Sequence, residues 1–352
     1  MRLGPIGTFV PHTALTVADV TAEAGLPDAK ARFYRDYLGF RDIPRSPGHS
    51  LADMLTAAGR EALSGTDPRG VRQVLYARIG EDADPAGDDP TGAQLLDSVR
   101  TALGLDHAPA FSVGQMNCAA GLFALFLAEQ LLRRPGGDLS PQNDDSGSVL
   151  LLTGDRVARP RQGVIPGIAV VADAAAACVV GPRVPGDRLL GSAFRTYGRF
   201  YRSLGGADPD REREYTRFYA PALAAVIEEA LGEAGTGLDG VRWIVPHNVN
   251  RLSWKGVAKE LGIPFSQVFL DNLPRLGHAN CSDPYLNLAS LRASGRLGPG
   301  DTYVLATVGL GATFGAAVLE RGDERCDERE NGRGSEREYE PGNGRGRSHG
   351  EL

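Results

Sequence analysis

Apolar and polar positions follow one another along the chain in a pattern that predicts buried strands separated by helices. Short, nearly continuous apolar runs suit strands that are buried on both faces. These runs lie at 73–77, 108–113, 148–153, 167–171, 176–180, 241–245, 302–307 and 313–319. Between them, apolar residues recur at helical spacing, most clearly at 118–134 and in a long segment after Asp208. Strands and helices that alternate in this way predict stacked α/β layers.

The same pattern divides the chain into two similar halves and a tail. Each half contains a strand, a polar corner and a helix, and each closes with a glycine-rich pair of strands. We therefore predict an N-terminal half over residues 1–175 and a C-terminal half over 176–320. Residues 321–352 are rich in charge, Gly and Ser, and so few apolar side chains cannot offset the entropy cost of ordering. They are predicted to be a disordered tail.

Composition narrows the class of protein. The chain has 352 residues, of which 42% are hydrophobic and 23% charged, as in globular proteins with a substantial core. A net charge of -6 without a basic patch argues against nucleic acid as a partner. No run reaches the roughly 18 apolar residues of a spanning helix, so we expect no membrane partner and a cytoplasmic location. The four cysteines are widely spaced with no CxxC motif, which indicates neither a disulfide framework nor a metal site.

One cysteine stands where chemistry is favoured. Residues 111–121 read as a buried strand that turns tightly into the 118–134 helix, which places Cys118 at or near the helix N-terminus. The unsatisfied amides and the helix dipole at that position favour a thiolate. Small residues at Ala119, Ala120 and Gly121 are expected to leave room beside the sulfur. A lone cysteine in an apolar stretch is more often an inert core residue, so Cys118 needs support from other polar groups.

Two polar clusters supply that support. The strand at 241–245 is followed by His247, and a histidine at the end of a strand is a candidate base or hydrogen-bond donor. A second cluster contains His278 and Asp283 at the start of a predicted helix. Because Pro284 follows Asp283, this carboxylate also fits a simple helix-capping role. Both interpretations of Asp283 stay open at this point.

Together these motifs resemble the ketoacyl-ACP synthase III group of the thiolase superfamily. The resemblance rests on the Cys118 elbow, His247-x-x-Asn250, the Gly277-His278 turn and the glycine-rich segment 309–315, in that order. It covers roughly residues 1–320. It implies a duplicated thiolase fold of five layers, α/β/α/β/α, and a homodimer.

The resemblance also implies a mechanism. Cys118 would attack an acyl thioester of acyl carrier protein or CoA and form an acyl-enzyme. The backbone amides of Cys118 and Leu310 would form the oxyanion hole, and His247 would act on the second substrate. No cofactor is implied beyond the acyl thioester itself.

Further residues carry a role only through the resemblance. Phe33 and Tyr37 match positions that hold the donor, and Asn250 is assigned to substrate or donor binding. The segment 193–203 corresponds to a region that covers the substrate tunnel, and we expect it to form a lid over the acceptor.

One departure from the family pattern bears on the second half-reaction. Ordinary synthase III enzymes carry Asn where this chain has His278, whereas relatives of antibiotic pathways resemble it in having His followed by Asp. This predicts an acyltransferase of natural-product biosynthesis that uses Cys118, His278 and Asp283 to acylate a hydroxyl or amine of a small molecule. A decarboxylative condensing enzyme is the alternative, because a cysteine with two histidines also serves carbon–carbon bond formation. A catalytically inactive partner subunit is a third interpretation.

Overall fold

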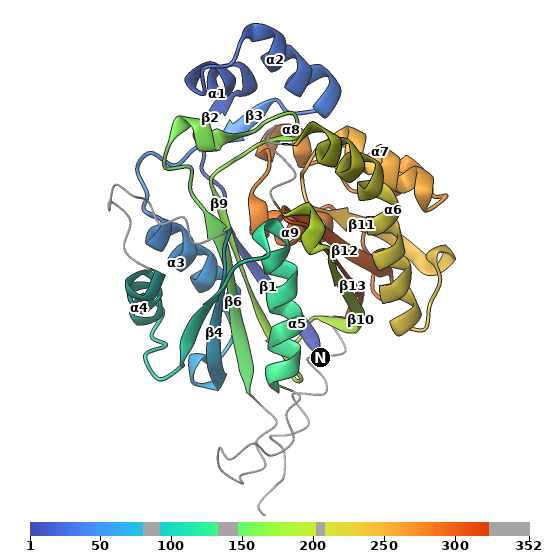
Figure 1. Ribbon diagram of the computed structural model, residues 1–352. Coiled ribbons are helices and arrows are strands. Elements are labelled where there is room, and N and C mark those ends of the chain that lie inside the picture. The colour runs from blue at the N-terminus through green and yellow to red at the C-terminus, as the bar shows by residue number, and fades with distance from the viewer. Residues whose placement is uncertain (80–91, 133–146, 202–207, 324–352) are drawn as a thin grey trace, which may run out of the picture. The chain divides into compact units, whose positions relative to one another are not determined.

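The computed structural model describes residues 1–79, 92–132, 147–201 and 208–323. Its core is built from two groups of strands that meet edge to edge (Figure 1). The first group has the spatial order β1-β9-β6-β4-β5, and the second has the order β11-β12-β13-β10. The first-group strands are β1 (Arg2–Phe9), β4 (Val71–Ala77), β5 (Ala110–Val113), β6 (Ser148–Asp155) and β9 (Ala174–Gly181). Those of the second are β10 (Asp187–Thr196), β11 (Val241–Pro246), β12 (Thr302–Gly309) and β13 (Thr313–Glu320).

The two groups repeat one topology. In the first, β4 runs parallel to β5 and β6, while β9 is antiparallel to both β6 and β1. In the second, β11 runs parallel to β12, and β13 is antiparallel to both β12 and β10. A parallel bridge between Ile244 and Val268 takes the place on β11 that β5 takes on β4. The duplication expected from the sequence is therefore visible strand by strand.

Helices complete five layers around these strands (Figure 1). Helices α3 (Leu51–Ala62) and α4 (Gly92–Ala102) lie on the outer side of the first group, with α3 packed on β1, β6 and β9. Helices α5 (Ala120–Leu132) and α9 (Asp283–Ala293) contact strands of both groups and form the middle layer. Helix α6 (Pro209–Glu233) covers the second group and packs on α7 (Arg251–Glu260). This is the predicted α/β/α/β/α arrangement.

A smaller set of elements sits at one end of these layers. It contains β2 (Ala14–Thr16), α1 (Val17–Glu23), α2 (Asp28–Phe33), β3 (Asp42–Pro44), β7 (Val164–Ile165), β8 (Ala169–Val170) and α8 (Leu273–Leu276). A separate apolar cluster, which includes Tyr34, Phe40 and Ile43, holds it together. The run at 167–171 therefore contributes only the two-residue strand β8.

The structure corrects the sequence analysis at three places. Strands β1 and β10 were not predicted, because β1 is interrupted by Gly and Pro and β10 alternates buried with exposed residues. Part of the expected lid at 193–203 is strand, since 193–196 belong to β10 and pair with β13. The expected boundary at 175 falls inside β9, and the repeated topology puts the junction in the loop between β9 and β10. Most of the predicted tail lies outside the described residues.

Candidate functional site

The nucleophile elbow is a strained turn between β5 and α5. Gln115 and Asn117 adopt positive φ angles of 67° and 48°, which side chains other than glycine rarely accept. Cys118 follows within a short 3₁₀ turn, Asn117–Ala119, directly before α5. The Thr307 hydroxyl of β12 donates to the Cys118 carbonyl at 3.1 Å. Strand β12 therefore fixes the cysteine backbone.

Small residues after the cysteine serve packing rather than substrate access. A Cβ placed on Gly121 would lie 2.4 Å from the carbonyl oxygen of Cys281. Ala119 and Ala120 are fully buried. The expectation that these residues leave room beside the sulfur is thus wrong, because the turn around Cys281 fills that space.

The second polar cluster brings a histidine and a carboxylate to the thiol. The Sγ atom of Cys118 lies 3.2 Å from Nε2 of His278, and Nδ1 of His278 lies 2.6 Å from Oδ2 of Asp283. All three residues are buried, with Cys118 exposed by 5%. The three groups form a continuous hydrogen-bonded array of nucleophile, base and orienting carboxylate.

Asp283 is held in place by the backbone rather than serving as a helix cap. Its Oδ1 accepts from the amide of Ala279 at 2.7 Å, and its Oδ2 also accepts from the amide of Asn248 at 2.6 Å. The N-cap position of α9 is Ser282. The capping interpretation of Asp283 is therefore replaced by one in which the carboxylate orients His278.

The array sets where the proton rests. Burial alone would lower the pKa of His278, but the neighbouring Cys118 and Asp283 raise this pKa well above its ordinary value. The imidazole of His278 is therefore a strong proton acceptor beside the thiol. It can serve as the base for Cys118 without help from a further residue.

His247 lies beside the array but does not join it. Its ring centroid is 6.1 Å from that of His278, and its Nε2 is 3.2 Å from the hydroxyl of Tyr219 on α6. Burial, followed by the proximity of His278, lowers the pKa of His247 to about 3, so this imidazole is neutral. Its Nδ1 has no hydrogen-bond partner in the described part of the chain. Sequence reasoning missed Tyr219, whose apolar neighbours gave it the pattern of a packing residue.

The glycine-rich turn between β12 and β13 packs against the elbow. A Cβ on Gly309 would lie 1.7 Å from the carbonyl oxygen of Met116, so only glycine permits this approach. The Asn117 side chain donates to the Leu310 carbonyl at 2.6 Å. The two backbone segments expected to supply the oxyanion hole, at Cys118 and Leu310, are thus brought together.

The three residues assigned to donor binding do not contact this array. Asn250 caps α7, since its Oδ1 accepts from the amide of Ser253 at 2.7 Å and its Nδ2 donates to Ile168 at 3.1 Å. Both ends of its amide thus hold the start of α7 in place, and the binding role expected of Asn250 stays a prediction. Phe33 and Tyr37 stack with ring centroids 5.9 Å apart, and Tyr37 is 62% exposed.

Two further polar residues border the array and were given no role from the sequence. The Cys118 thiol donates to Oδ1 of Asn280 at 3.7 Å. Burial raises the pKa of Asp155, at the end of β6, and the nearby Asn280 amide opposes this rise. The sequence offered a signal for Asn280, which lies in the polar cluster with His278, but none for Asp155.

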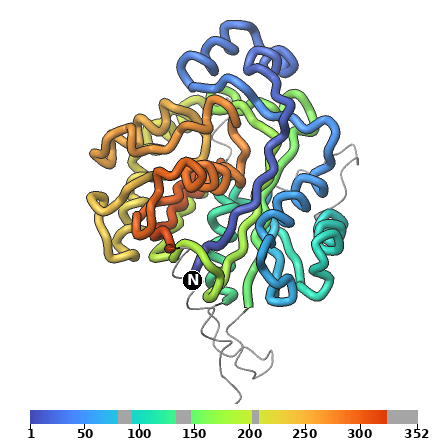
Figure 2. The backbone as a smooth tube through the Cα atoms, turned by 180° about the vertical axis from the view of Figure 1, so that it is seen from behind, coloured from blue at the N-terminus to red at the C-terminus, as the bar shows by residue number. Residues whose placement is uncertain are grey.

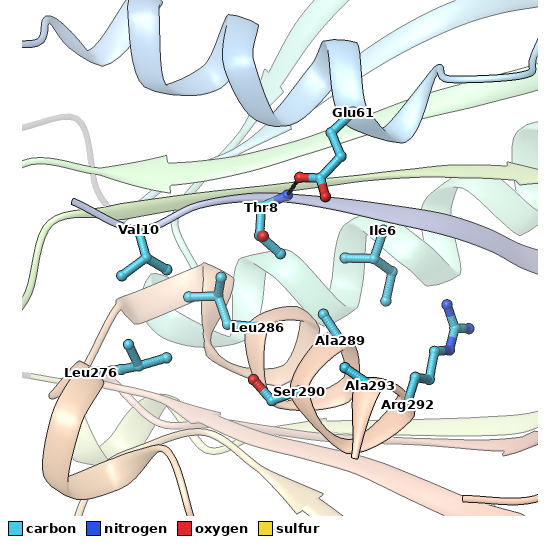
Figure 3. Close-up of a pocket in the computed structure, with 10 residues that line it drawn as sticks. All are labelled: Ile6, Thr8, Val10, Glu61, Leu276, Leu286, Ala289, Ser290, Arg292 and Ala293. Carbon is cyan, nitrogen blue, oxygen red and sulfur yellow. Dashed lines mark hydrogen bonds between the residues drawn. The ribbon is translucent and has the colours of Figure 1, made fainter. Parts of the chain in front are cut away.

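A surface groove lies apart from the array. Its lining includes Ile6 and Thr8 of β1, Glu61 of α3, and Leu286 and Arg292 of α9 (Figure 3). Figure 2 shows β1 in dark blue passing between α3 and the orange region that contains α9. The Thr8 amide donates to Glu61 at 2.6 Å. None of the predicted site residues lines this groove.

Two other features are absent from the described ranges. Those residues contain no cluster of His, Cys, Asp or Glu suited to hold a metal ion. No helix in them is long and apolar enough to cross a bilayer. Their three cysteines, Cys118, Cys178 and Cys281, are free and buried.

Comparison with known proteins identifies relatives of this chain in sequence and in fold. Residues 231–321 match the family model described as 3-oxoacyl-[acyl-carrier-protein (ACP)] synthase III C terminal. The β-ketoacyl-[acyl-carrier-protein] synthase III of Rhizorhabdus wittichii is 30% identical over 291 residues, which span 77% of this chain and 84% of that protein. The Lactobacillus delbrueckii enzyme of the same name is 25% identical over 334 residues, or 90% of this chain and 98% of its own length. The chain belongs to the β-ketoacyl-[acyl-carrier-protein] synthase III family of the thiolase superfamily.

Solved structures share the fold at lower identity. The acyltransferase ChlB3 superposes with a TM-score of 0.76 at 21% identity, covering 92% of this chain and 98% of ChlB3. The priming β-ketosynthase of the R1128 polyketide pathway gives 0.72 at 21% identity, covering 92% and 96%. At this identity the likeness concerns the fold, which accommodates both kinds of protein.

Proposed function

We propose that this protein is an acyltransferase that carries an acyl group on Cys118 and delivers it to a hydroxyl or amine. The observation that carries the proposal is the buried array in which Cys118 Sγ lies 3.2 Å from His278, and His278 lies 2.6 Å from Asp283. A nucleophile, a base and an orienting carboxylate in this order suit acyl transfer through a covalent intermediate. Kinship with synthase III enzymes supports a thioester donor.

The first half-reaction loads the enzyme. The Cys118 thiolate attacks the carbonyl carbon of an acyl thioester, and the oxyanion that develops is held by amides of the elbow and of the turn at Leu310. The carbon–sulfur bond to the donor then breaks. The released donor thiolate takes the proton from His278. An acyl-Cys118 enzyme with a neutral His278 results.

The second half-reaction unloads it. Acylation removes the negative sulfur that raised the pKa of His278, so the imidazole becomes a base whose orientation Asp283 still fixes. It accepts the proton of the acceptor hydroxyl or amine while the oxygen or nitrogen attacks the thioester carbon. The bond to Cys118 breaks, and the thiolate beside a protonated His278 is restored. No proton has to be exchanged with solvent.

The position of His247 supports a heteroatom acceptor over a condensing reaction. Decarboxylation needs hydrogen-bond donors free to hold an enolate oxygen. Here Nε2 of His247 is engaged by Tyr219 at 3.2 Å, and Nδ1 of His278 is engaged by Asp283. Nε2 of His278 faces the thiol at 3.2 Å, which leaves Nδ1 of His247 as the ring nitrogen of this pair that has no partner among the described residues. We infer that His247 shapes the wall of the acceptor pocket through Tyr219.

The decarboxylative synthase is kept as the second candidate. It is favoured by the presence of a second histidine, His247, beside the histidine that contacts the thiol, with ring centroids 6.1 Å apart. The curated relatives at 25% and 30% identity are also synthases. The two functions differ in whether carbon dioxide leaves the second substrate.

We propose acyl carrier protein or CoA as the donor and a homodimer as the working assembly. The stacked pair Phe33 and Tyr37 offers an exposed aromatic surface to a donor. Strand β5 ends the sheet, and Phe111 on it is 38% exposed, so a second copy could extend the sheet at this edge. Light scattering on the full chain would measure the mass of the assembly.

Incubation with a panel of acyl thioesters, read by intact-protein mass spectrometry, tests the loading step. An acyl adduct that is absent in Cys118→Ala is expected. A protein that no thioester of the panel acylates would instead be an inactive partner subunit.

A further inference from the structure

Two buried polar atoms beside the nucleophile have no hydrogen-bond partner in the described part of the chain. They are Nδ2 of Asn280 and Oδ2 of Asp155. An amide nitrogen is a donor and a carboxylate oxygen an acceptor, so each is the partner the other lacks. The triad mechanism uses neither atom. Unsatisfied buried groups of this kind cost free energy and need an explanation.

The two side chains belong to segments that pack together, and one of them touches the sulfur. The Thr153 hydroxyl of β6 donates to the Ser282 hydroxyl at 2.9 Å, which holds the end of β6 against the turn Asn280–Ser282. Burial raises the pKa of Asp155, and the nearby Asn280 amide opposes this rise. The other end of the same amide, Oδ1, faces the Cys118 thiol at 3.7 Å. Asn280 thus lies between carboxyl and thiol, with a backbone φ of 51° that the surrounding turn imposes.

We propose that Asp155 is a positioning residue that determines which end of the Asn280 carboxamide meets the Cys118 sulfur. When Asp155 is ionised it attracts the Nδ2 donors, and Oδ1 is left facing the thiol, as in this structure. A carbonyl oxygen there accepts from the S–H group and disfavours a thiolate. When Asp155 is protonated its O–H donates to Oδ1, the amide turns over, and Nδ2 donates to the sulfur. This second arrangement stabilises the thiolate.

The surroundings of Asp155 cause its protonation state to change near neutral pH. Burial raises the pKa of Asp155 to about 7, against the lowering effects of the Ile79 amide, Arg78, His278 and Asn280. Cys281, the remaining titratable neighbour, has a pKa well above its ordinary value, chiefly through burial, and stays neutral. Asp155 therefore changes charge near neutrality while Cys281 does not.

The consequence is a nucleophile whose reactivity is restrained as the pH rises. Thiol ionisation alone makes alkylation faster at higher pH. Ionisation of Asp155 opposes this rise by turning Oδ1 toward the sulfur. In Asp155→Asn the new amide is neutral at every pH and can always donate to Oδ1 of Asn280, so the restraint is removed.

The test measures the alkylation rate of Cys118 by iodoacetamide from about pH 5.5 to 9, a range that brackets an Asp155 pKa near 7. The full chain carries Cys326→Ser to remove one competing thiol, and peptide mass mapping locates the adduct. Asp155→Asn is expected to match the parent at the acidic end and to react about tenfold faster at the basic end, as befits a charge-assisted hydrogen bond. Asp97→Asn, on the exposed face of α4, is the matched control and should follow the parent throughout. A rate ratio between Asp155→Asn and the parent that does not vary with pH would overturn the proposal.

A second variant separates the amide from the charge alone. In an Asn280→Ala background, Asp155→Asn should leave the pH profile unchanged, because no amide remains to be turned. If Asp155→Asn still altered the profile in that background, Asp155 would act directly on the sulfur and the proposal would fall. Alkylation needs no acyl donor or acceptor, so this result is independent of whether the proposed acyl transfer is found.

Discussion

Nδ1 of His278 lies 2.6 Å from Oδ2 of Asp283, and the two side chains are exposed by only 2% and 0%. Two backbone amides also bind this carboxylate, so it is fixed before any substrate arrives. The imidazole is therefore oriented with Nε2 toward Cys118. Because Asp283 holds it, the His278 imidazole returns to the same orientation after each turnover, as a general base requires. A histidine without such a carboxylate partner is better suited to donating a hydrogen bond.

The variant Asp283→Asn tests that orientation. The carbonyl oxygen of the new carboxamide can accept from one of the two amides, but the negative charge that helps to raise the pKa of His278 is lost. We expect the rate of acyl transfer to fall by about 10² to 10⁴, the range seen when an orienting carboxylate is neutralised. Steady-state rates measured across pH give the comparison. A variant with unchanged rates and an unchanged profile would show that Asp283 only supports the turn.

Tyr219→Phe tests the role given to His247. The change removes the hydroxyl 3.2 Å from Nε2 of His247 and keeps the ring packing on α6. Transfer to a hydroxyl or amine should fall by less than about tenfold, as for the loss of one neutral hydrogen bond. Decarboxylation of a malonyl thioester, measured as labelled carbon dioxide, should increase because His247 is free. A complete loss of acyl transfer would instead place Tyr219 in the chemistry.

Gly309→Ala probes the contact between the glycine-rich turn and the elbow. Its Cβ would lie 1.7 Å from the Met116 carbonyl oxygen, which forces the turn away from Cys118. Acyl-enzyme formation, followed by intact mass, should slow by about 10²-fold or more, as when an oxyanion donor is lost. Gly298→Ala is the matched control, because its Cβ would make only ordinary contact at 3.6 Å. Equal loading rates in the two variants would remove the turn from the oxyanion hole.

Asp155→Asn should also change stability in a pH-dependent direction. The pKa of this acid is raised by burial to about 7 in the folded state, so the folded protein holds a proton that the unfolded chain releases near pH 4. The stability that this proton contributes is greatest below about pH 4 and is lost as the pH rises through 7. The variant should therefore exceed the parent in free energy of unfolding by about 4 kcal/mol near pH 8, with little difference near pH 4. Urea unfolding at the two pH values, with Asp97→Asn alongside, measures the difference; a gain equal at both values contradicts it.

Most of the fold could be predicted from the sequence because buried strands appear in it as continuous apolar runs. The runs at 148–153 and 313–319 became β6 and β13 nearly unchanged. Strand β1, with Gly and Pro inside it, has no such signal and is held by pairing with β9. Pairing partners distant in sequence supply information that no local window contains.

Part of the site could also be predicted, because some of its residues lie within recognisable sequence motifs. Cys118, His247 and His278 stand at ends of elements, where motif order and the family resemblance reveal them. Asp155 and Tyr219 come from β6 and α6, and only packing brings them near the array, with Tyr219 against His247. Asn250 was assigned to binding through the resemblance alone, and the helix cap that its amide forms could not be inferred from that resemblance.

In the proposed reaction Cys118, His278 and Asp283 move an acyl group to a heteroatom. This is tested most directly by isolating the acyl-Cys118 enzyme and chasing it, in separate reactions, with amine or alcohol acceptors and with a labelled malonyl thioester. Mass spectrometry follows loss of the acyl group, and labelled carbon dioxide is counted. We expect discharge by an amine or alcohol without carbon dioxide release, abolished in His278→Ala. Discharge by the malonyl thioester alone, with stoichiometric carbon dioxide, would contradict the proposed acyl transfer and establish a condensing enzyme.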